Sequence, residues 1–355
     1  MTPLAEAPAY LAVPGDLATA SGGYAYDRAL IAASGGALAP LSLPMLGARP
    51  DWTLVEPAMA ALAAVPPGRP VLVDGLALAT LPPARLAGLD APLAALIHHP
   101  LALEHGLGAE DAAWLADNER AALAACRAVV TTSAATATIL VRDYAVPGER
   151  LTVAGPGTPR PAGATTRRPS GTPVHLLSVA ALVPRKGFDT LVEALAAVPG
   201  DWRLTVIGPA RDADHVALLH RLTAEHGLAG RIAWVGERPA AEVAAAMARA
   251  DLFVLASRYE GYGMAYAEAL VAGLPVVGCD TGAVAEATRG GALLVPPDDP
   301  AALAGALAPL IADPAARAAL AARGAKAARA LPGWPYTWTA VAGALAPLGL
   351  RRPAP

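Results

Sequence analysis

Two carboxylates with seven residues between them, Glu260 and Glu268, are the first candidates for chemistry. They lie in residues 251–278, DLFVLASRYEGYGMAYAEALVAGLPVVG, where the apolar run 252–256 predicts a strand buried on both faces. The next segment, 263–272, has the length of a helix and is apolar almost all round, so we expect it to be buried. Because an unpaired buried carboxylate is strongly destabilising, Glu268 needs a hydrogen-bonding partner, and a ligand would be one.

A glycine-bracketed turn joins this strand to this helix. Gly261 and Gly263 flank Tyr262, and glycines allow backbone N–H groups to approach a ligand closely. At the end of the strand, Glu260 is placed to accept hydrogen bonds from sugar hydroxyls. The alternative interpretation makes Glu260 a surface carboxylate and Glu268 the ion-pair partner of an arginine.

A second candidate is the turn VPRKG, which contains Arg185 and Lys186 at a junction of strand and helix. Lys186 is one of only two lysines among 27 basic residues, which suggests that a compact point charge is needed there. The start of a helix carries partial positive charge, so two cations are unfavourable unless an anion such as a phosphate occupies the turn. The alternative is a pair of solvated surface cations.

Composition restricts the class of protein. The chain has 355 residues, of which 55% are hydrophobic but only 5% aromatic, as in a soluble, helix-rich α/β protein with two domains. No apolar run approaches the roughly 18 residues of a membrane helix, and the first residues do not resemble a signal peptide. Cys126 and Cys279 lie in apolar runs, which predicts buried thiols in a reducing compartment. We therefore expect a cytoplasmic protein and leave open its peripheral attachment to the inner face of a membrane.

Charge is unevenly distributed along the chain. Residues 1–157 contain 8 arginines, no lysine and 14 acidic residues, a net charge of −6, whereas residues 158–355 contain 19 basic and 16 acidic residues, a net charge of +3. The acidic first half argues against nucleic acid as a partner and disfavours an anionic membrane surface. The mildly basic second half suits a small phosphorylated ligand.

Short apolar runs alternate with helical patterns in both halves of the chain, which predicts two parallel, doubly wound sheets. The predicted strands are 10–13, 37–43, 71–73, 93–97, 128–131 and 151–153, then 174–179, 202–207, 232–235, 252–255, 275–277 and 292–295. The predicted helices are 24–33, 109–125, 133–144, 186–198, 212–227, 240–249, 263–272, 299–312, 314–330 and 336–348.

Four segments follow from this pattern. Residues 1–157 form a first Rossmann-like domain, and the proline- and glycine-rich residues 158–173 form a linker. Residues 174–333 form a second Rossmann-like domain, and residues 334–355 form a crossover helix and tail. If the two domains face each other, the carboxyl ends of both sheets meet at a central cleft, where ligands of such sheets bind.

The first domain offers two further candidates. Gly22 and Gly23 follow its first strand, where the alternative to a ligand-binding loop is a tight turn before a helix. His98 and His99 end the strand 93–97, and two histidines at that position favour a role beyond structure. No group of His, Cys and Asp has the sequence spacing of metal ligands, so we expect neither a metal nor a cofactor.

Together, the VPRKG turn, the EGYGMAYAEAL segment and the GLPVVG segment resemble the retaining glycosyltransferases of family 4, over about residues 174–310. This resemblance implies the two-domain GT-B fold, with a central cleft and a final helix that crosses back to the first domain. It also implies that Lys186 contacts a donor diphosphate, Glu260 the donor sugar and Glu268 the nucleotide ribose. The backbone amides of residues 261–263 are then expected near the sugar and phosphate.

The resemblance extends less specifically to other positions. Many members carry an arginine where this chain has Ala181, and Arg185 is a candidate to supply the missing charge. Gly22 and Gly23 correspond to a loop near the donor phosphates and the acceptor. A histidine close to the transferred sugar is implied at the end of the strand, and we favour His98 over His99.

The implied function is retaining transfer of a sugar from a UDP- or GDP-type donor, without a metal. The acceptor is open: a lipid-linked sugar, a polysaccharide chain or a small molecule. Two alternatives remain at this point. One is a nucleotide-sugar epimerase on the same fold, and the other is a non-catalytic protein that binds nucleotide sugars, which Ala181 makes plausible.

Overall fold

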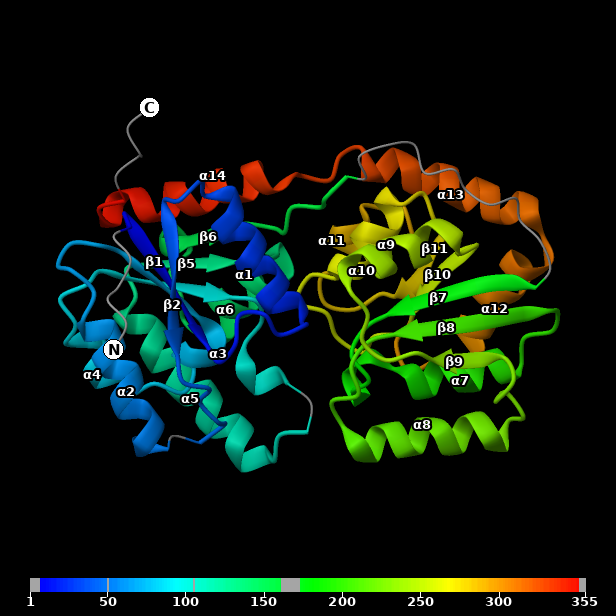
Figure 1. The fold of residues 1–355 in the computed structure, drawn as a ribbon, viewed down its shortest axis with the longest axis horizontal. Coiled ribbons are helices and arrows are strands. Elements are labelled where there is room, and N and C mark those ends of the chain that lie inside the picture. The colour runs from blue at the N-terminus through cyan, green and yellow to red at the C-terminus, as the bar shows by residue number, and fades with distance from the viewer. Residues whose placement is uncertain (1–6, 50, 105, 161–172, 351–355) are drawn as a thin grey trace. The chain divides into compact units, whose positions relative to one another are not determined.

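The computed structural model describes residues 7–49, 51–104, 106–160 and 173–350. The chain divides into two compact units, which are drawn in Figure 1. The first unit is Met1–Gly157 with Pro332–Pro355, and the second is Thr158–Leu331. Of the predicted linker 158–173, residues 161–172 lie outside the described residues.

The first unit is built on a six-stranded parallel sheet with the strand order β2-β1-β3-β4-β5-β6. The strands are β1 (Ala9–Pro14), β2 (Leu38–Leu43), β3 (Val71–Asp74), β4 (Leu93–Ile97), β5 (Ala128–Thr131) and β6 (Leu151–Val153). The helices are α1 (Gly22–Ala33), α2 (Trp52–Ala63), α3 (Gly75–Leu78), α4 (Pro83–Ala87), α5 (Ala109–Ala125), α6 (Ala134–Asp143) and α14 (Trp334–Leu345).

The second unit has a six-stranded parallel sheet with the strand order β12-β11-β10-β7-β8-β9. The strands are β7 (Val174–Val179), β8 (Trp202–Ile207), β9 (Ile232–Trp234), β10 (Leu252–Leu255), β11 (Val276–Cys279) and β12 (Leu293–Val295). The helices are α7 (Phe188–Ala196), α8 (Ala213–Glu225), α9 (Ala240–Arg249), α10 (Met264–Val271), α11 (Val284–Thr288), α12 (Pro300–Ala312) and α13 (Pro314–Ala328).

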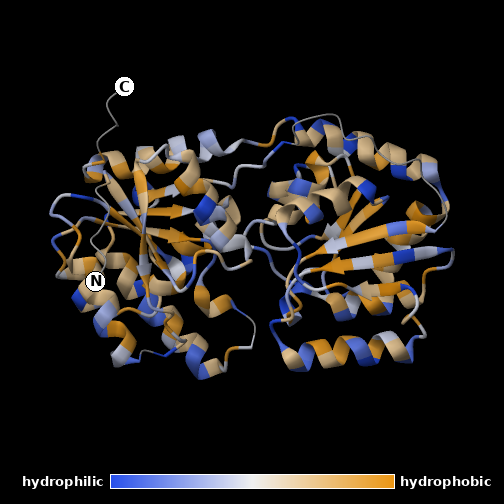
Figure 2. Ribbon diagram, viewed as in Figure 1, coloured by the Kyte–Doolittle hydropathy of each residue, from blue (hydrophilic) through white to orange (hydrophobic). Residues whose placement is uncertain are grey.

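The burial of each strand explains the pattern of apolar residues in its sequence. Every residue of the inner strands β3, β4, β5 and β10 is buried, whereas the edge strand β2 alternates between buried and exposed residues. The inner strands are therefore continuous apolar runs, because helices cover both faces of a parallel sheet. Figure 2 shows this hydrophobic interior in both units. The predicted pair of Rossmann-like, doubly wound domains is confirmed.

The last helix, α14, packs on the first unit, as predicted. Thr337 Oγ1 donates to the carbonyl oxygen of Gly155 at 2.7 Å, and the rings of Tyr26 and Trp334 meet edge to face with centroids 5.3 Å apart. The helix begins at Trp334 rather than at residue 336 because Pro335 occupies its first turn, where a missing N–H is tolerated.

One predicted boundary is wrong in a way that matters for the site. The helix expected from Lys186 begins only at Phe188, because Gly187 adopts a left-handed conformation with φ of +63°. A methyl group on Gly187 would lie 1.9 Å from the carbonyl oxygen of Ala256, so only glycine fits this close approach. Arg185 and Lys186 therefore lie in a short 3-10 turn, Pro184–Lys186, that precedes the helix.

Among the described helices, no single one is both long and apolar enough to cross a membrane. The pair α12 and α13, bent by 109°, meets the requirement in length and composition only.

Candidate functional site

A buried ion pair lies at the carboxyl ends of the neighbouring strands β7 and β10. The 3-10 turn after β7 carries Lys186, whose Nζ lies 2.7 Å from Oε1 of Glu260 in the loop after β10. Ser257 Oγ donates to the same oxygen at 2.7 Å. Arg185 lies beside them, with NH1 3.9 Å from Oε2 of Glu260 and 3.0 Å from the carbonyl oxygen of Tyr259. The structure thus brings together Lys186, Arg185 and Glu260, which were predicted from two separate stretches.

The charge state of Glu260 follows from these contacts. Burial alone would raise its pKa, but the charges of Lys186 and Arg185 and the hydrogen bonds from Lys186 and Ser257 hold the pKa below its ordinary value. Glu260 is therefore an ionised carboxylate at neutral pH, and it is not the solvated surface residue of the alternative interpretation. We expected Arg185 and Lys186 to be unfavourable in this turn unless an anion occupied it. The structure corrects this expectation, because the carboxylate of Glu260 supplies the negative charge.

The backbone of Glu260 is fixed by the loop after β11. Ala283 N–H donates to the carbonyl oxygen of Glu260 at 3.0 Å, and Thr281 Oγ1 donates to that of Arg258 at 2.6 Å. Gly282 has φ of +52°, and a methyl group on it would lie 2.1 Å from the Glu260 carbonyl oxygen. The loop position is therefore restricted to glycine by both conformation and space.

The turn between Glu260 and α10 has the conformation expected of a glycine-bracketed loop. Gly263 adopts φ of +104° and occupies the position before the first helical residue, Met264. Tyr262 is buried, whereas Gly261 is only partly buried. Of the two glycines, Gly261 is partly buried and Gly263 is buried, and the approach of their backbone N–H groups to a ligand stays a prediction.

Glu268 is the fifth residue of α10 and is partly buried. Within the described part of the chain its side chain has no hydrogen-bond or ion-pair partner, so the alternative of an ion pair with an arginine is wrong. Burial raises the pKa of Glu268 from 4.5 to about 7. The carboxyl group is therefore a partly buried polar group without a partner among the described residues, and a bound ligand could supply one.

Arg258 was not predicted from the sequence, yet it links the turn before α7 to the loop that contains Glu260. Arg258 pairs with Asp189 in the first turn of α7, through NH1 at 3.0 Å and NH2 at 2.8 Å, and its Nε donates to Asp298 at 2.6 Å. NH1 also donates to the carbonyl oxygen of Pro184. Arg258 therefore braces the 3-10 turn that carries Lys186. The only signal in the sequence was an arginine two residues before Glu260.

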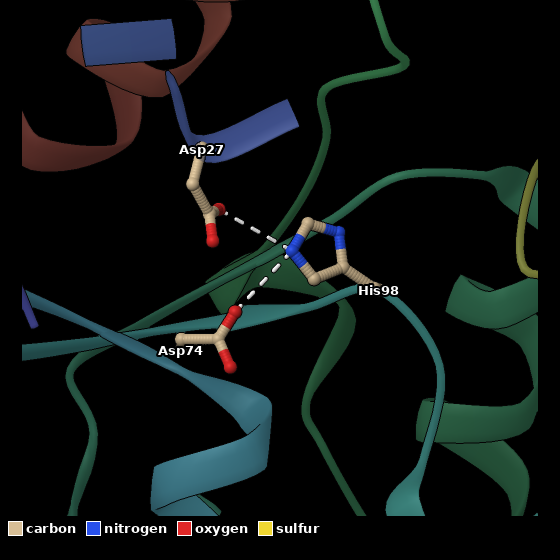
Figure 3. Close-up of side chains that lie close together, drawn as sticks. All are labelled: Asp27, Asp74 and His98. Atoms are coloured by element: carbon tan, nitrogen blue, oxygen red, sulfur yellow. Dashed lines mark ion pairs between the residues drawn. The ribbon is translucent and has the colours of Figure 1, made fainter. Parts of the chain in front are cut away.

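A second group of side chains lies in the first unit, around His98 (Figure 3). Its Nε2 lies 3.4 Å from Oδ1 of Asp27 on α1 and 3.3 Å from Oδ2 of Asp74, the last residue of β3. Burial would lower the pKa of His98, but the two carboxylates outweigh it and raise the pKa to about 10. Burial raises the pKa of Asp27 to about 6 in turn. Neither aspartate was identified from the sequence.

Gly22 and Gly23 have different surroundings in the structure, and so do His98 and His99. Gly22 and Gly23 begin α1 behind the cap residue Ser21. A methyl group on Gly23 would lie 3.3 Å from Cδ2 of His98, whereas one on Gly22 would meet nothing within 4 Å. His99 turns elsewhere, with Nε2 2.8 Å from Oε2 of Glu104. The structure therefore joins Gly23 to His98 and separates Gly22 and His99 from them.

The expectation that no metal-ligand cluster exists needs a correction. Oxygen atoms of Asp27 and Asp74 and a ring nitrogen of His98 lie within 4.8 Å of one another, so these three residues could hold a cation. The fold brings together residues whose spacing along the chain gives no such signal. Residues 212–214 also form an Asp-x-Asp sequence, but its first aspartate has a structural role. Asp212 Oδ1 accepts a hydrogen bond from His215 N–H at 2.9 Å and so caps α8.

The chain resembles known proteins in its second unit and in its fold. Residues 166–327 match the family model of the glycosyl transferases group 1. The chain is similar to the lipopolysaccharide core biosynthesis glycosyltransferase LpsE of Rhizobium meliloti, with 33% identity over 158 residues, which cover 44% of each chain. The chain spans about half the length of the first curated relatives it matches.

Two solved structures show the same fold at low sequence identity. Sucrose-phosphate synthase from Thermosynechococcus elongatus has a TM-score of 0.79 at 21% identity and covers 96% of this chain and 99% of its own. HepE from Anabaena, solved in complex with UDP and glucose, has a TM-score of 0.73 at 18% identity and covers 96% of this chain and 100% of its own. These similarities confirm that the two Rossmann-like units form the predicted GT-B type of fold.

Proposed function

We propose that this chain is a group 1 glycosyltransferase, of the retaining family 4, that moves a sugar from a nucleotide diphosphate sugar to an acceptor. Three observations support the proposal. The family match covers Lys186, Glu260 and Glu268, the fold is that of solved glycosyltransferases, and the three side chains have the charges that a donor requires. The observation that carries most weight is the 2.7 Å ion pair between Lys186 and Glu260, two positions 74 residues apart.

The roles of the three side chains follow from their charges. Lys186 places a positive charge at the turn before α7, where it stabilises the negative charge that develops on a departing diphosphate. Glu260, an ionised carboxylate, accepts hydrogen bonds from hydroxyl groups of the donor sugar. Glu268 accepts hydrogen bonds from the ribose, which supplies the partner that the protein does not. Backbone amides of Gly261 and Gly263 face the sugar and phosphate.

The chemical step in this proposal is attack of an acceptor hydroxyl on the same face of the sugar that the diphosphate leaves. The new bond forms between the acceptor oxygen and the anomeric carbon as the bond from that carbon to the diphosphate oxygen breaks. The leaving phosphate takes the proton of the acceptor hydroxyl, and the configuration of the anomeric carbon is retained. Lys186 carries the electrostatic stabilisation of the leaving group, so no metal or cofactor is required at the diphosphate.

The donor and acceptor are proposed only as classes. The complex of HepE with UDP and glucose supports a UDP-type donor, and a GDP-type donor remains in the proposal. The acceptor is a sugar, a lipid-linked sugar or a small molecule, and the similarity to a lipopolysaccharide core glycosyltransferase supports glycan biosynthesis. We place the reaction in the cytoplasm because Cys126 and Cys279 are buried free thiols, with peripheral attachment to the inner face of a membrane as the alternative.

Product analysis separates the proposal from its alternatives. The purified protein is incubated with UDP-, GDP- and ADP-sugars and a panel of acceptors, and nucleotides and sugars are separated by chromatography. Release of free nucleoside diphosphate with a glycosylated acceptor supports transfer. An altered sugar that is still attached to its nucleotide would indicate an epimerase. Binding of nucleotide without turnover of any donor would indicate a non-catalytic binding protein.

Substitution at the ion pair tests the site itself. Lys186→Ala and Glu260→Gln are each expected to lower kcat/KM by about a hundredfold or more, because each removes a charge used in the transition state. The matched controls are Lys326→Ala, at the only other lysine of the chain, and Glu193→Gln, at an exposed position of α7. Equal loss in the site variants and the controls would contradict the assignment.

A further inference from the structure

Three side chains from three different elements of the first unit converge on one point. They are Asp27 of α1, Asp74 at the end of β3, and His98 directly after β4. Asp27 is 1% exposed and Asp74 is 2% exposed. Nε2 of His98 lies 3.4 Å from Asp27 Oδ1 and 3.3 Å from Asp74 Oδ2, and Figure 3 shows it directed between the two carboxylates. The cluster therefore presents one nitrogen and two carboxylate groups to a common centre.

Hydrogen bonds within the protein do not satisfy these atoms. Both carboxylate oxygens of Asp27 and Nε2 of His98 are buried without a hydrogen-bond partner among the described residues. N–H···O hydrogen bonds are ordinarily about 2.7–3.2 Å long, which is shorter than either distance from Nε2 to an aspartate. Asp74 Oδ1 accepts from Leu76 N–H at 2.8 Å, so only its Oδ2 faces the cluster. Asp27 thus has two deeply buried oxygens that call for a partner.

The surrounding charges favour a cation as that partner. Among the described residues of the first unit, the buried acids are Asp27, Asp74 and Glu119, and no arginine or lysine is buried. Arg28 is the next residue after Asp27, but it is exposed and donates to backbone carbonyl oxygens of the loop before α1. Buried carboxylates are strongly unfavourable without a compensating positive charge, and a divalent cation would supply it.

The spacing of the ligand atoms matches the coordination sphere of a metal ion. Two ligands that each lie about 2.0–2.1 Å from a tetrahedral ion are separated by about 3.3–3.4 Å, as Nε2 of His98 is from each aspartate. One ligand atom from each of the three residues lies within 4.8 Å of the other two. Three such atoms all lie within about 2.8 Å of a common centre, so binding at about 2.0–2.2 Å needs only small movements of the side chains.

We propose that Asp27, Asp74 and His98 bind one divalent transition-metal cation of the Zn²⁺ class, which ties α1 to the carboxyl ends of β3 and β4. His98 binds it through Nε2, Asp74 through Oδ2, and Asp27 through both oxygens, so the protein supplies four ligand atoms. The imidazole favours Zn²⁺ over Mg²⁺ and Ca²⁺, which prefer oxygen ligands. A site closed by four protein atoms is structural. The ion takes no part in the sugar transfer proposed for the second unit, and its binding does not depend on that proposal.

Calorimetric titration of the full chain tests the affinity and the choice of metal. The protein is stripped with EDTA, returned to chelator-free buffer and titrated with Zn²⁺, Mn²⁺ or Mg²⁺. We expect one equivalent of Zn²⁺ to bind with a micromolar or lower Kd, and Mg²⁺ to bind at least about a hundredfold more weakly. Free Zn²⁺ at about 100 times its Kd should raise Tm by roughly 4 °C. Absence of Zn²⁺ binding, or tighter binding of Mg²⁺ than of Zn²⁺, would overturn the proposal.

Substitutions test where the ion binds. Asp27→Asn, Asp74→Asn and His98→Gln each remove one ligand and should raise the Kd for Zn²⁺ by about a hundredfold. The matched controls are Asp117→Asn, whose side chain is 78% exposed, and His226→Gln, at an exposed position after α8. Both controls should bind Zn²⁺ as the wild type does. Unchanged affinity in all three site variants would show that the ion binds elsewhere.

Crystallography of the wild type decides the matter even if the variants fail to fold. Crystals of the full chain grown with Zn²⁺ are measured above and below the zinc absorption edge. An anomalous peak is expected about 2 Å from Nε2 of His98 and from oxygens of Asp27 and Asp74. Anomalous peaks at other places only would refute the site. Because none of these measurements uses glycosyl transfer, failure of the proposed function leaves the result unaffected.

Discussion

Replacing Glu268 by glutamine is expected to stabilise the protein and to weaken its binding of nucleotide. The side chain is partly buried in α10 and has no partner within the described part of the chain, and desolvation raises its pKa from 4.5 to about 7. Between these two pH values the native protein binds more protons at Glu268 than the unfolded chain does. Stability therefore falls as the pH rises through this window, and the loss is complete above the folded pKa.

The magnitude follows from the size of the shift. Each pKa unit corresponds to about 1.36 kcal/mol, so a shift from 4.5 to about 7 lowers the free energy of unfolding by about 3 kcal/mol above pH 7. Glutamine resembles the neutral carboxyl group in shape and cannot ionise. The Tm of Glu268→Gln should therefore equal that of the wild type at about pH 5 and exceed it by roughly 4 °C at about pH 8.5.

The assay is thermal unfolding of the full chain at several pH values, with and without UDP or GDP. Glu193→Gln, on the exposed face of α7, controls for the general effect of removing one acid. In the wild type the nucleotide supplies hydrogen bonds to the charged carboxylate, each worth roughly 1.5–3 kcal/mol. We therefore expect the variant to bind UDP or GDP about ten- to a hundredfold more weakly.

Two results would refute this reasoning. If Glu268→Gln is no more stable than the wild type at pH 8.5, the carboxyl group has a partner or is well solvated. If the variant is stabilised but binds nucleotide as tightly as the wild type, burial of Glu268 has a reason other than ribose binding.

Three further predictions concern packing. Gly23→Ala should displace the ring of His98 and lower activity in the nucleotide-release assay. Gly22→Ala, whose methyl group would meet nothing within 4 Å, should leave that activity unchanged, and equal effects of the two substitutions would contradict the ring contact. Gly282→Ala should lower the unfolding free energy by about 2 kcal/mol or more in urea denaturation, because φ is +52° and the methyl clashes with a backbone carbonyl. The control is Gly305→Ala, at an exposed position within α12, which should raise the unfolding free energy by about 0.5–1 kcal/mol in the same experiment. A decrease in the unfolding free energy of this control would contradict the explanation by backbone conformation and space. Arg258→Lys should lower the free energy of unfolding by about 1–3 kcal/mol, because lysine cannot form the bidentate pair; an unchanged urea midpoint would show that the brace is not needed.

The sequence alone was sufficient for the fold and for the main charges of the candidate site. Apolar runs that alternate with helical patterns predict parallel sheets, because burial on both faces removes polar residues from the inner strands. Lys186 and Glu260 could be identified because each lies in a short turn at a strand end, where local sequence determines the backbone. The last helix was also predictable, since the Pro332–Pro335 break separates it from α13.

Only the tertiary structure decided which side chains meet. Asp27, Asp74 and His98 come from α1, β3 and β4, and nothing in their local sequence records that the parallel order β1-β3-β4 places them together. The partners of Arg258 and the absence of a protein partner for Glu268 are likewise properties of packing. Periodicity reports which face of an element is buried, whereas distance between side chains depends on how elements are ordered in the sheet. The sequence could therefore predict Lys186 and Glu260 as site residues, whereas it could not predict that Asp27 and Asp74 lie beside His98.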